Sequence, residues 1–170
     1  MIRPFAFSTS EFVMRIIEIP ASDSARLIPL LQDLHALHVA HQPTRHTKDP
    51  NHKDLEVWLG EWLATEGLFA LGAESPQGAL LGYLIYQIEH REALPVRAAE
   101  TRAMLHHIAV QDAWQRMGVG KALMEQMKAK VSAMDISVIA ATYAQFNDAS
   151  AALMAGMGLQ PVLTLAEWRA

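Results

Sequence analysis

The stretch "HHIAVQDAWQRMGVGKALM" (residues 106–124) joins an apolar, strand-like run to an amphipathic helix through a turn that contains two glycines. The pattern predicts that the strand ends at Val110 and that the helix begins near Gly118. The first N–H groups of a helix have no partner within it and lie at the positive end of its dipole, so this turn is suited to bind a phosphate. Glycine at Gly118 and Gly120 would let a bulky diphosphate approach the backbone, and Lys121 adds a positive charge. The alternative interpretation is a tight strand-to-helix turn that binds nothing.

Two well-known phosphate-binding motifs do not fit this turn. The nucleotide-binding P-loop requires glycine where Gln115 stands and serine or threonine where Ala122 stands. The dinucleotide-binding fingerprint requires a third glycine where Leu123 stands, and it follows an early strand of the fold. If this turn binds an anion, the chain is therefore neither a P-loop protein nor a dinucleotide-binding protein of the usual kind.

The rest of the chain predicts one α/β domain with a mixed sheet, because strand-like and helix-like apolar patterns are interspersed along it. Strands are expected at residues 14–19, 67–75, 79–89, 100–110, 135–144 and 159–168. Helices are expected at residues 21–42, 54–64, 118–133 and 147–158. Residues 1–13 are mixed and turn-rich, so we expect an N-terminal extension there and a single domain over residues 14–170.

Composition narrows the classes of partner. Lys and Arg number 14 against 18 Asp and Glu, a formal charge of −4, which argues against nucleic acid as a partner. The sequence contains no cysteine, which excludes disulfides, thiolate metal sites and a thiol nucleophile and suits a cytoplasmic protein. No apolar run reaches the length of a membrane helix, so we expect no membrane association.

The segment "QRMGVGKALM" resembles the acyl-CoA pyrophosphate motif of the GNAT acetyltransferase superfamily, with Gln115, Gly118 and Gly120 at the defining positions. A second segment, "NDASAALMAGMGL", is similar to a downstream family segment at Asn147 and Gly158, with leucine where phenylalanine is usual. The order of the expected elements is also that of the GNAT fold. The resemblance implies a mostly antiparallel sheet, flanked by helices, that splays between the strands at 100–110 and 135–144.

The resemblance also implies where acetyl-CoA binds. In that family the pantetheine arm lies in the gap between the two splayed strands, where it would bond to the backbone of Ile108 and Val110. The N–H groups of residues 117–121 would hold the pyrophosphate. The implied contact set is Ile108, Ala109, Val110, Gln115, Arg116, Met117, Gly118, Val119, Gly120, Lys121 and Asn147. Asn147 has the alternative role of a helix N-cap, and both roles can hold at once.

Acetyl transfer requires an unprotonated amine, and alkyl amines with a pKa of about 10.4 are mostly charged at neutral pH. Many GNAT enzymes carry a glutamate as base at the position of Met104, and a thioether cannot accept a proton. Strand alternation predicts that His106 shares the face of Met104, Ile108 and Val110, and some family members carry a histidine there. His106 is therefore the expected catalytic base, the alternative being a core histidine bonded to the backbone. The same alternation predicts a structural His107 on the opposite face.

The resemblance implies that the leaving thiolate is protonated by a tyrosine on the helix at 147–158, and this chain has Met154 at that position. Because a thiol has a pKa of about 8.5, the thiolate leaves readily and solvent can replace the acid. Tyr83 and Tyr143 are the candidate substitutes.

Several histidines and two tryptophans lie on and after the first two expected helices. His35 and His38 share a helix face, but His41 lies well round from His35 and no carboxylate completes a ligand pattern, so we expect no metal. The loop that follows either shapes the amine pocket or is solvated surface. The helical spacing of Trp58 and Trp62 is typical of core residues.

These observations predict an N-acetyltransferase that transfers an acetyl group from acetyl-CoA to a primary amine of a small molecule or peptide. Transfer would be direct, in a ternary complex, because the chain lacks a cysteine to carry an acyl group. The alternative is a GNAT-fold acyl-CoA-binding or regulatory module without catalysis, since Met104 and Met154 replace both usual acid and base groups. A homodimer is a further expectation, because dimers are frequent in the family.

Overall fold

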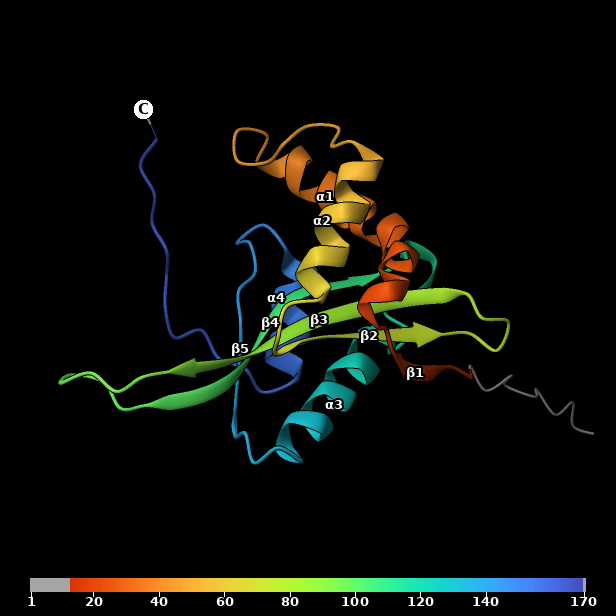
Figure 1. The fold of residues 1–170 in the computed structure, drawn as a ribbon. Helices are drawn as coiled ribbons and strands as arrows, with labels where there is room; N and C mark the ends of the chain where they lie inside the picture. Colours follow the sequence, from red (N-terminus) through yellow and green to blue (C-terminus); the bar gives the residue numbers. More distant parts are fainter. Residues whose placement is uncertain (1–12, 170) are drawn as a thin grey trace, which may run out of the picture.

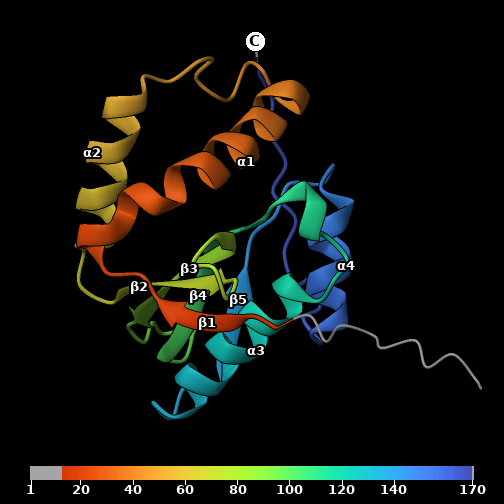
Figure 2. The ribbon, with the colours of Figure 1, turned by 90° about the vertical axis from the view of Figure 1, so that its right-hand side faces the viewer.

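A five-stranded sheet separates two layers of helices in the computed structural model, which describes residues 13–169 (Figures 1 and 2). Helices α1 (Ile28–His41) and α2 (His52–Leu63), preceded by the 3-10 helix η1 (Ala21–Leu27), cover one face. Helices α3 (Val119–Ser132) and α4 (Asp148–Gly156) cover the other face. Residues 1–12 lie outside the described part, so the expected extension at residues 1–13 stays a prediction.

The strands follow one another in the sheet in chain order. They are β1 (Arg15–Glu18), β2 (Leu68–Glu74), β3 (Leu80–Arg91), β4 (Glu100–Val110) and β5 (Val138–Ala141). The pairs from β1 to β4 are antiparallel, and β4 and β5 are parallel. The prediction of a mixed, mostly antiparallel sheet flanked by helices is therefore confirmed.

The sheet opens between β4 and β5. Strand β5 pairs only with residues 102–105 of β4, and the last pair joins Leu105 to Ala141. From His106 to Val110, β4 continues along β3 without β5 on its other side. The predicted splay is thus present, and it leaves half of β4 with a free edge.

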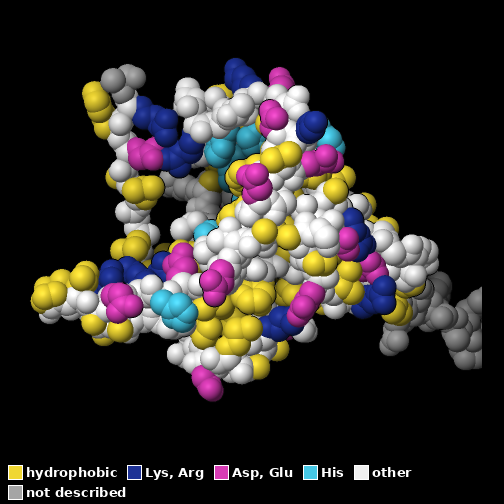
Figure 3. Space-filling model, in the orientation of Figure 1, with side chains coloured by type: hydrophobic (Ala, Val, Ile, Leu, Met, Phe, Trp, Pro, Cys, Tyr) yellow, Lys and Arg dark blue, Asp and Glu magenta, His cyan; other side chains and the backbone are white. Residues whose placement is uncertain are grey.

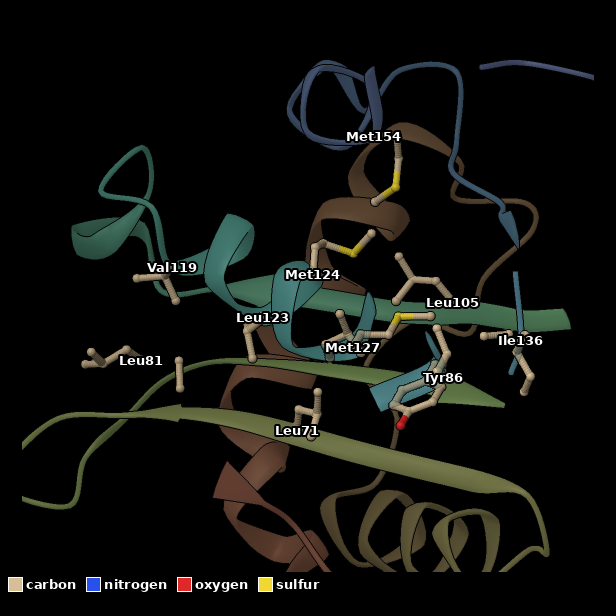
Figure 4. Close-up of a cluster of buried hydrophobic side chains, with 14 residues drawn as sticks. Leu71, Leu81, Tyr86, Leu105, Val119, Leu123, Met124, Met127, Ile136 and Met154 are labelled. Carbon is tan, nitrogen blue, oxygen red and sulfur yellow. The ribbon is translucent and has the colours of Figure 1, made fainter. Parts of the chain in front are cut away.

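Each face of the sheet packs its own apolar core. On the α3 side, Leu123, Met127 and Val131 are buried against the sheet, and Figure 4 shows the first two in this core. On the α1 side, η1, α1 and α2 bury residues such as Leu27, Ile28 and Leu59. These two cores fix which residues of β4 face which helical layer.

Two strand predictions near the C-terminus are wrong. The strand expected at 135–144 is limited to β5, whose four residues are half-buried because β5 lies at the edge of the sheet. The strand expected at 159–168 is absent; beyond Leu159, which packs on the core, the segment leaves the body, with Val162 87% and Leu163 91% exposed, until Glu167 pairs with Arg45 of the loop after α1 (Figures 1 and 3). An alternating apolar pattern yields a strand only where a partner strand supplies hydrogen bonds.

Within residues 13–169, no helix combines the length and the apolar character needed to cross a bilayer.

Candidate active site

The turn after β4 is held by a glutamine side chain. Gln115 donates from Nε2 to the backbone oxygen of Val110 at 3.2 Å and to Oδ1 of Asp112 at 2.9 Å. The short 3-10 helix η2 (Asp112–Trp114) fills the turn between them. Gln115 therefore ties the start of α3 to the end of the free edge of β4.

Glycine is required at the two positions of this turn for different reasons. Gly118 is the N-cap of α3 and adopts a left-handed conformation with φ of 87°, which favours glycine. Gly120 has ordinary backbone angles, but a Cβ placed there would lie 3.2 Å from Cδ2 of Leu153 and 3.8 Å from Cγ2 of Val110. The first glycine shapes the turn, and the second keeps clear the space where α3 approaches α4 and β4.

Backbone groups on the free edge of β4 point into the gap. The N–H of Gln111 donates to the oxygen of Leu81 in β3 at 2.9 Å. Since successive backbone groups of a strand alternate in direction, those of Ile108 and Val110 point away from β3. The free edge of β4 and the first N–H groups of α3 follow one another along the chain, separated by the turn at residues 111–118, and the Val110 oxygen on this edge accepts from Gln115.

Asn147 has its expected structural role. Its Oδ1 accepts from the backbone N–H of Ser150 at 3.0 Å and caps α4. The N-cap prediction is confirmed.

A β-bulge in β4 changes which side chains face which layer. Ile85 of β3 is paired with His107 and Tyr86 with Leu105, so His106 is an extra residue in β4. A bulge of this kind interrupts strand alternation. His106 and His107 therefore both lie on the face covered by α2, whereas Ile108 and Val110 pack against the core on the α3 side.

Two expectations based on strict alternation are thus wrong. His107 does not face away from His106, and Ile108 and Val110 do not share the face of His106. The physical reason is the bulge, whose position depends on the pairing with β3. His106 does share its face with Met104, since Met104 is paired with Gln87 and His106 contacts the same glutamine.

His106 is half-buried and makes one side-chain hydrogen bond. Its Nε2 lies 3.2 Å from Oε1 of Gln87, and its ring lies edge-on to Trp62 of α2 with centroids 5.6 Å apart. Burial lowers the pKa of His106 below its ordinary value, and the nearby Glu89 carboxylate opposes that shift. The imidazole is therefore neutral at pH 7 and able to accept a proton.

His107 lies deeper in the same face. Its Nδ1 is 3.5 Å from the hydroxyl of Tyr83, and its ring lies edge-on to Trp62 with centroids 5.1 Å apart. Burial lowers the pKa of His107 to about 4, helped by the proximity of His106 and His38. Burial also raises the pKa of Tyr83, so this hydroxyl stays protonated at neutral pH.

The buried His107 predicts a loss of stability in acid. Between pH 6.5 and 4 the unfolded chain protonates this imidazole and the folded protein does not, so the free energy of unfolding falls as the pH falls. From pH 7 to pH 4.5 the contribution of His107 is about 2 to 3 kcal/mol. Between pH 7 and pH 4.5, the free energy of unfolding of His107→Gln should therefore fall by about 2 to 3 kcal/mol less than that of the wild type. Urea denaturation at both pH values measures the two free energies.

The matched control for that experiment is His90, an exposed histidine near the end of β3 whose ring bonds to the side chain of Thr101. His90→Gln should keep the wild-type pH dependence. If the free energy of unfolding falls equally for the wild type and His107→Gln, the low pKa of His107 in the folded protein is contradicted.

The residues at the usual acid position and its substitutes lie apart. Met154 is only 2% exposed and belongs to the core on the α3 side (Figure 4). Tyr83 is buried beside His107, on the opposite face of the sheet. Tyr143 is 39% exposed, in the segment after β5.

The histidines of α1 and its following loop form a cluster of rings. The ring centroid of His38 lies 5.2 Å from that of His46 and 5.4 Å from that of Phe146. The ring of His41 stacks on Phe146, with centroids 4.2 Å apart. Figure 3 shows histidine side chains gathered beside the loop between α1 and α2. Among the described residues, no group of three or more His, Asp or Glu side chains could hold a metal ion. The cluster instead joins the C-terminal end of α1 to the loop between β5 and α4.

Sequence reasoning missed Gln87 and Phe146 as neighbours of this site. Gln87 reaches His106 from the adjacent strand, and Phe146 reaches α1 from the opposite end of the chain. The strand pairing of Gln87 with Met104 could have pointed to the first. No local pattern marks the second.

The sequence matches the Acetyltransferase (GNAT) family over residues 31–159. The chain belongs to the GNAT acetyltransferase family. No curated protein matches the sequence.

Several solved structures share the fold of the chain. A tetramutant of the BH1408 protein from Bacillus halodurans has a TM-score of 0.81 at 14% identity, covering 92% of this chain and 99% of that one. The aminoglycoside N-acetyltransferase AAC(6')-Iy in complex with CoA has a TM-score of 0.73 at 15% identity, covering 96% and 99%. A ribosomal-protein-alanine N-acetyltransferase from Brucella melitensis biovar Abortus has a TM-score of 0.68 at 18% identity, covering 93% and 99%. At these identities the likeness concerns the fold.

Proposed function

We propose that the chain is an N-acetyltransferase that transfers an acetyl group from acetyl-CoA to a primary amine of a small molecule or peptide. The observation that carries this proposal is the free edge of β4 from His106 to Val110, which leads directly into the glycine turn and the first N–H groups of α3. An extended chain with amides and a pyrophosphate at one end, as in coenzyme A, suits this edge and the helix start that follows it.

The contacts to acetyl-CoA come from three places. The backbone of Ile108, Ala109 and Val110 borders the pantetheine arm like an added strand. The turn binds the pyrophosphate through the N–H groups of residues 117–121, with Gln115, Arg116 and Lys121 around it. The exposed Lys121 side chain pairs with Glu125, Nζ to Oε1 at 3.7 Å. Because a surface pair of this kind contributes little free energy, Lys121 can leave it and add its charge to the phosphate site. Asn147 contacts the thioester region while it caps α4.

The reaction needs a base beside the end of the free edge that lies farthest from the pyrophosphate. His106 stands there and takes a proton from the ammonium form of the acceptor. The amine nitrogen attacks the thioester carbonyl, and the new C–N bond forms as the carbonyl oxygen takes up negative charge. A backbone N–H near Ile108 stabilises that oxyanion. The C–S bond then breaks as the nitrogen, positively charged after the attack, gives up its second proton through water to the leaving thiolate.

Direct transfer agrees with the sequence. The chain contains no cysteine, so no thiol is present to accept the acetyl group as an intermediate carrier. A half-reaction that releases coenzyme A without any amine would contradict direct transfer.

Calorimetric titration with acetyl-CoA, followed by a release assay for free thiol over a panel of primary amines, tests this function. Micromolar binding and amine-dependent thiol release are expected, and the absence of cysteine removes any protein background from the assay. Absence of acetyl-CoA binding would overturn the proposal. Binding without turnover of any amine would favour the second candidate, a non-catalytic acyl-CoA-binding module, which the methionines at 104 and 154 motivate.

A further inference from the structure

The face of β4 that carries His106 is lined by aromatic rings from several parts of the chain. Trp58 and Trp62 of α2 stack with centroids 5.2 Å apart and an interplanar angle of 22°. Trp62 lies edge-on to both His106 and His107. We call these four residues, together with His38 and Phe146, the aromatic patch.

The second half of the aromatic patch comes from the opposite side of the site. His38, at the C-terminal part of α1, is close enough to His107 to affect its pKa, and its ring lies 5.4 Å from that of Phe146. Rings from α1 and the loop before α4 therefore lie near the same face of β4 as the rings of α2.

These rings are accessible. Trp58 is 45% exposed, contrary to the core position that its spacing predicted, and the other five residues of the patch are half-buried. An indole left open beside half-buried imidazoles provides apolar, flat surface for a ligand rather than for the core.

The charges at this place do not suit a polycation. Burial lowers the pKa of His38, His106 and His107, so all three imidazoles are neutral at pH 7. The carboxylate that acts on His106 is that of Glu89, and Arg102 holds it at 2.8 Å. An ammonium group of a ligand would compete with that arginine for Glu89.

We propose that the acceptor is a monoamine whose amino group is attached to a flat aromatic body, and that the aromatic patch binds this body by ring stacking while His106 receives the ammonium proton. This inference rests on the proposed function, because it assigns the acceptor of the same reaction. Trp58 is the specificity-determining residue: its ring is the most open and stacks directly on Trp62, which contacts His106.

Three amines separate flatness from size and from charge. Phenethylamine has the flat ring, 2-cyclohexylethylamine has an apolar body of similar size that is not flat, and neamine is a polycationic amino sugar. Because aromatic pairs contribute beyond the area they bury, KM for phenethylamine should be about 2- to 12-fold lower than for 2-cyclohexylethylamine. Neamine should have the lowest kcat/KM.

Three variants assign the effect to the patch. Trp58→Leu should remove most of the preference for phenethylamine, whereas Trp58→Phe should keep it. Trp168→Leu is the matched control, since Trp168 is 86% exposed in the C-terminal segment and none of the ring contacts of the described residues includes it. Circular dichroism of all three variants verifies that the fold is kept.

The outcomes distinguish this inference from the proposed function. Equal kcat/KM for the two apolar amines, or a preference for neamine, would overturn the inference and leave the acetyltransferase standing. If acetyl-CoA binds but no amine reacts, binding to the aromatic patch is measured instead, by the quenching of tryptophan fluorescence by phenethylamine in the presence of CoA. Saturable quenching that Trp58→Leu abolishes supports the aromatic patch as a binding surface, and its absence overturns it. Failure of acetyl-CoA to bind would instead refute the proposed function.

Discussion

Replacing His106 with alanine is expected to lower kcat at pH 7 by about 100-fold or more, because a positioned general base contributes about 10² to 10⁴ in rate. The amine acceptor is mostly protonated at that pH and needs a group to take its proton. His106 is neutral, half-buried and placed where β4 loses β5 as a neighbour. Steady-state kinetics with a reactive amine measure the effect.

The pH profile separates a base from a structural residue. Since burial lowers the pKa of His106, kcat of the wild type should fall only as the pH drops below the ordinary histidine value of about 6.5. The alanine variant should recover as the pH rises toward the pKa of the amine, because the acceptor then deprotonates without help. The defect should therefore shrink between pH 7 and pH 10.

His90→Ala is the matched control for this variant, since it removes an exposed histidine that bonds only to Thr101 among the contacts described. It should keep the wild-type kcat and the wild-type profile. A His106→Ala profile parallel to that of the wild type at every pH would remove His106 from the mechanism.

The contrast between the two histidines explains how far the sequence could be taken. The glycine turn was predicted correctly because its causes are local: Gly118 adopts a left-handed backbone at the residue before α3 begins. The faces of His106 and His107 were not, because the bulge at His106 arises from pairing with β3. A pattern of period two contains no signal for one extra residue.

Contacts between distant segments were also out of reach. The stack of His41 on Phe146 joins the end of α1 to the loop before α4, residues that no local pattern relates. The same limit applies to Trp58, whose spacing suited the core although only part of α2 is covered by the sheet. Periodicity tells which residues share a helix face and not what that face meets.

Replacing Gly120 with glutamate is expected to raise the Kd for acetyl-CoA by at least about 100-fold. The pyrophosphate is proposed to bind the N–H groups at the start of α3, and each hydrogen bond to a charged group contributes about 1.5 to 3 kcal/mol. A carboxylate at this position would compete for those groups and repel the phosphates. The Cβ itself would also press on Leu153, 3.2 Å away.

The loss of binding should not come from loss of the helix, because an acidic residue in the first turn of a helix is favourable to its dipole. Gly120→Ala adds the same Cβ without the charge, so it should raise Kd much less and thereby separate crowding from repulsion. Gly156→Glu is the matched control, since it puts the same side chain on a glycine of α4 with nothing within 4 Å. Calorimetry should then give a wild-type Kd for Gly156→Glu. An unchanged Kd for Gly120→Glu would mean that the glycine turn binds no phosphate, and the acyl-CoA site would have to lie elsewhere.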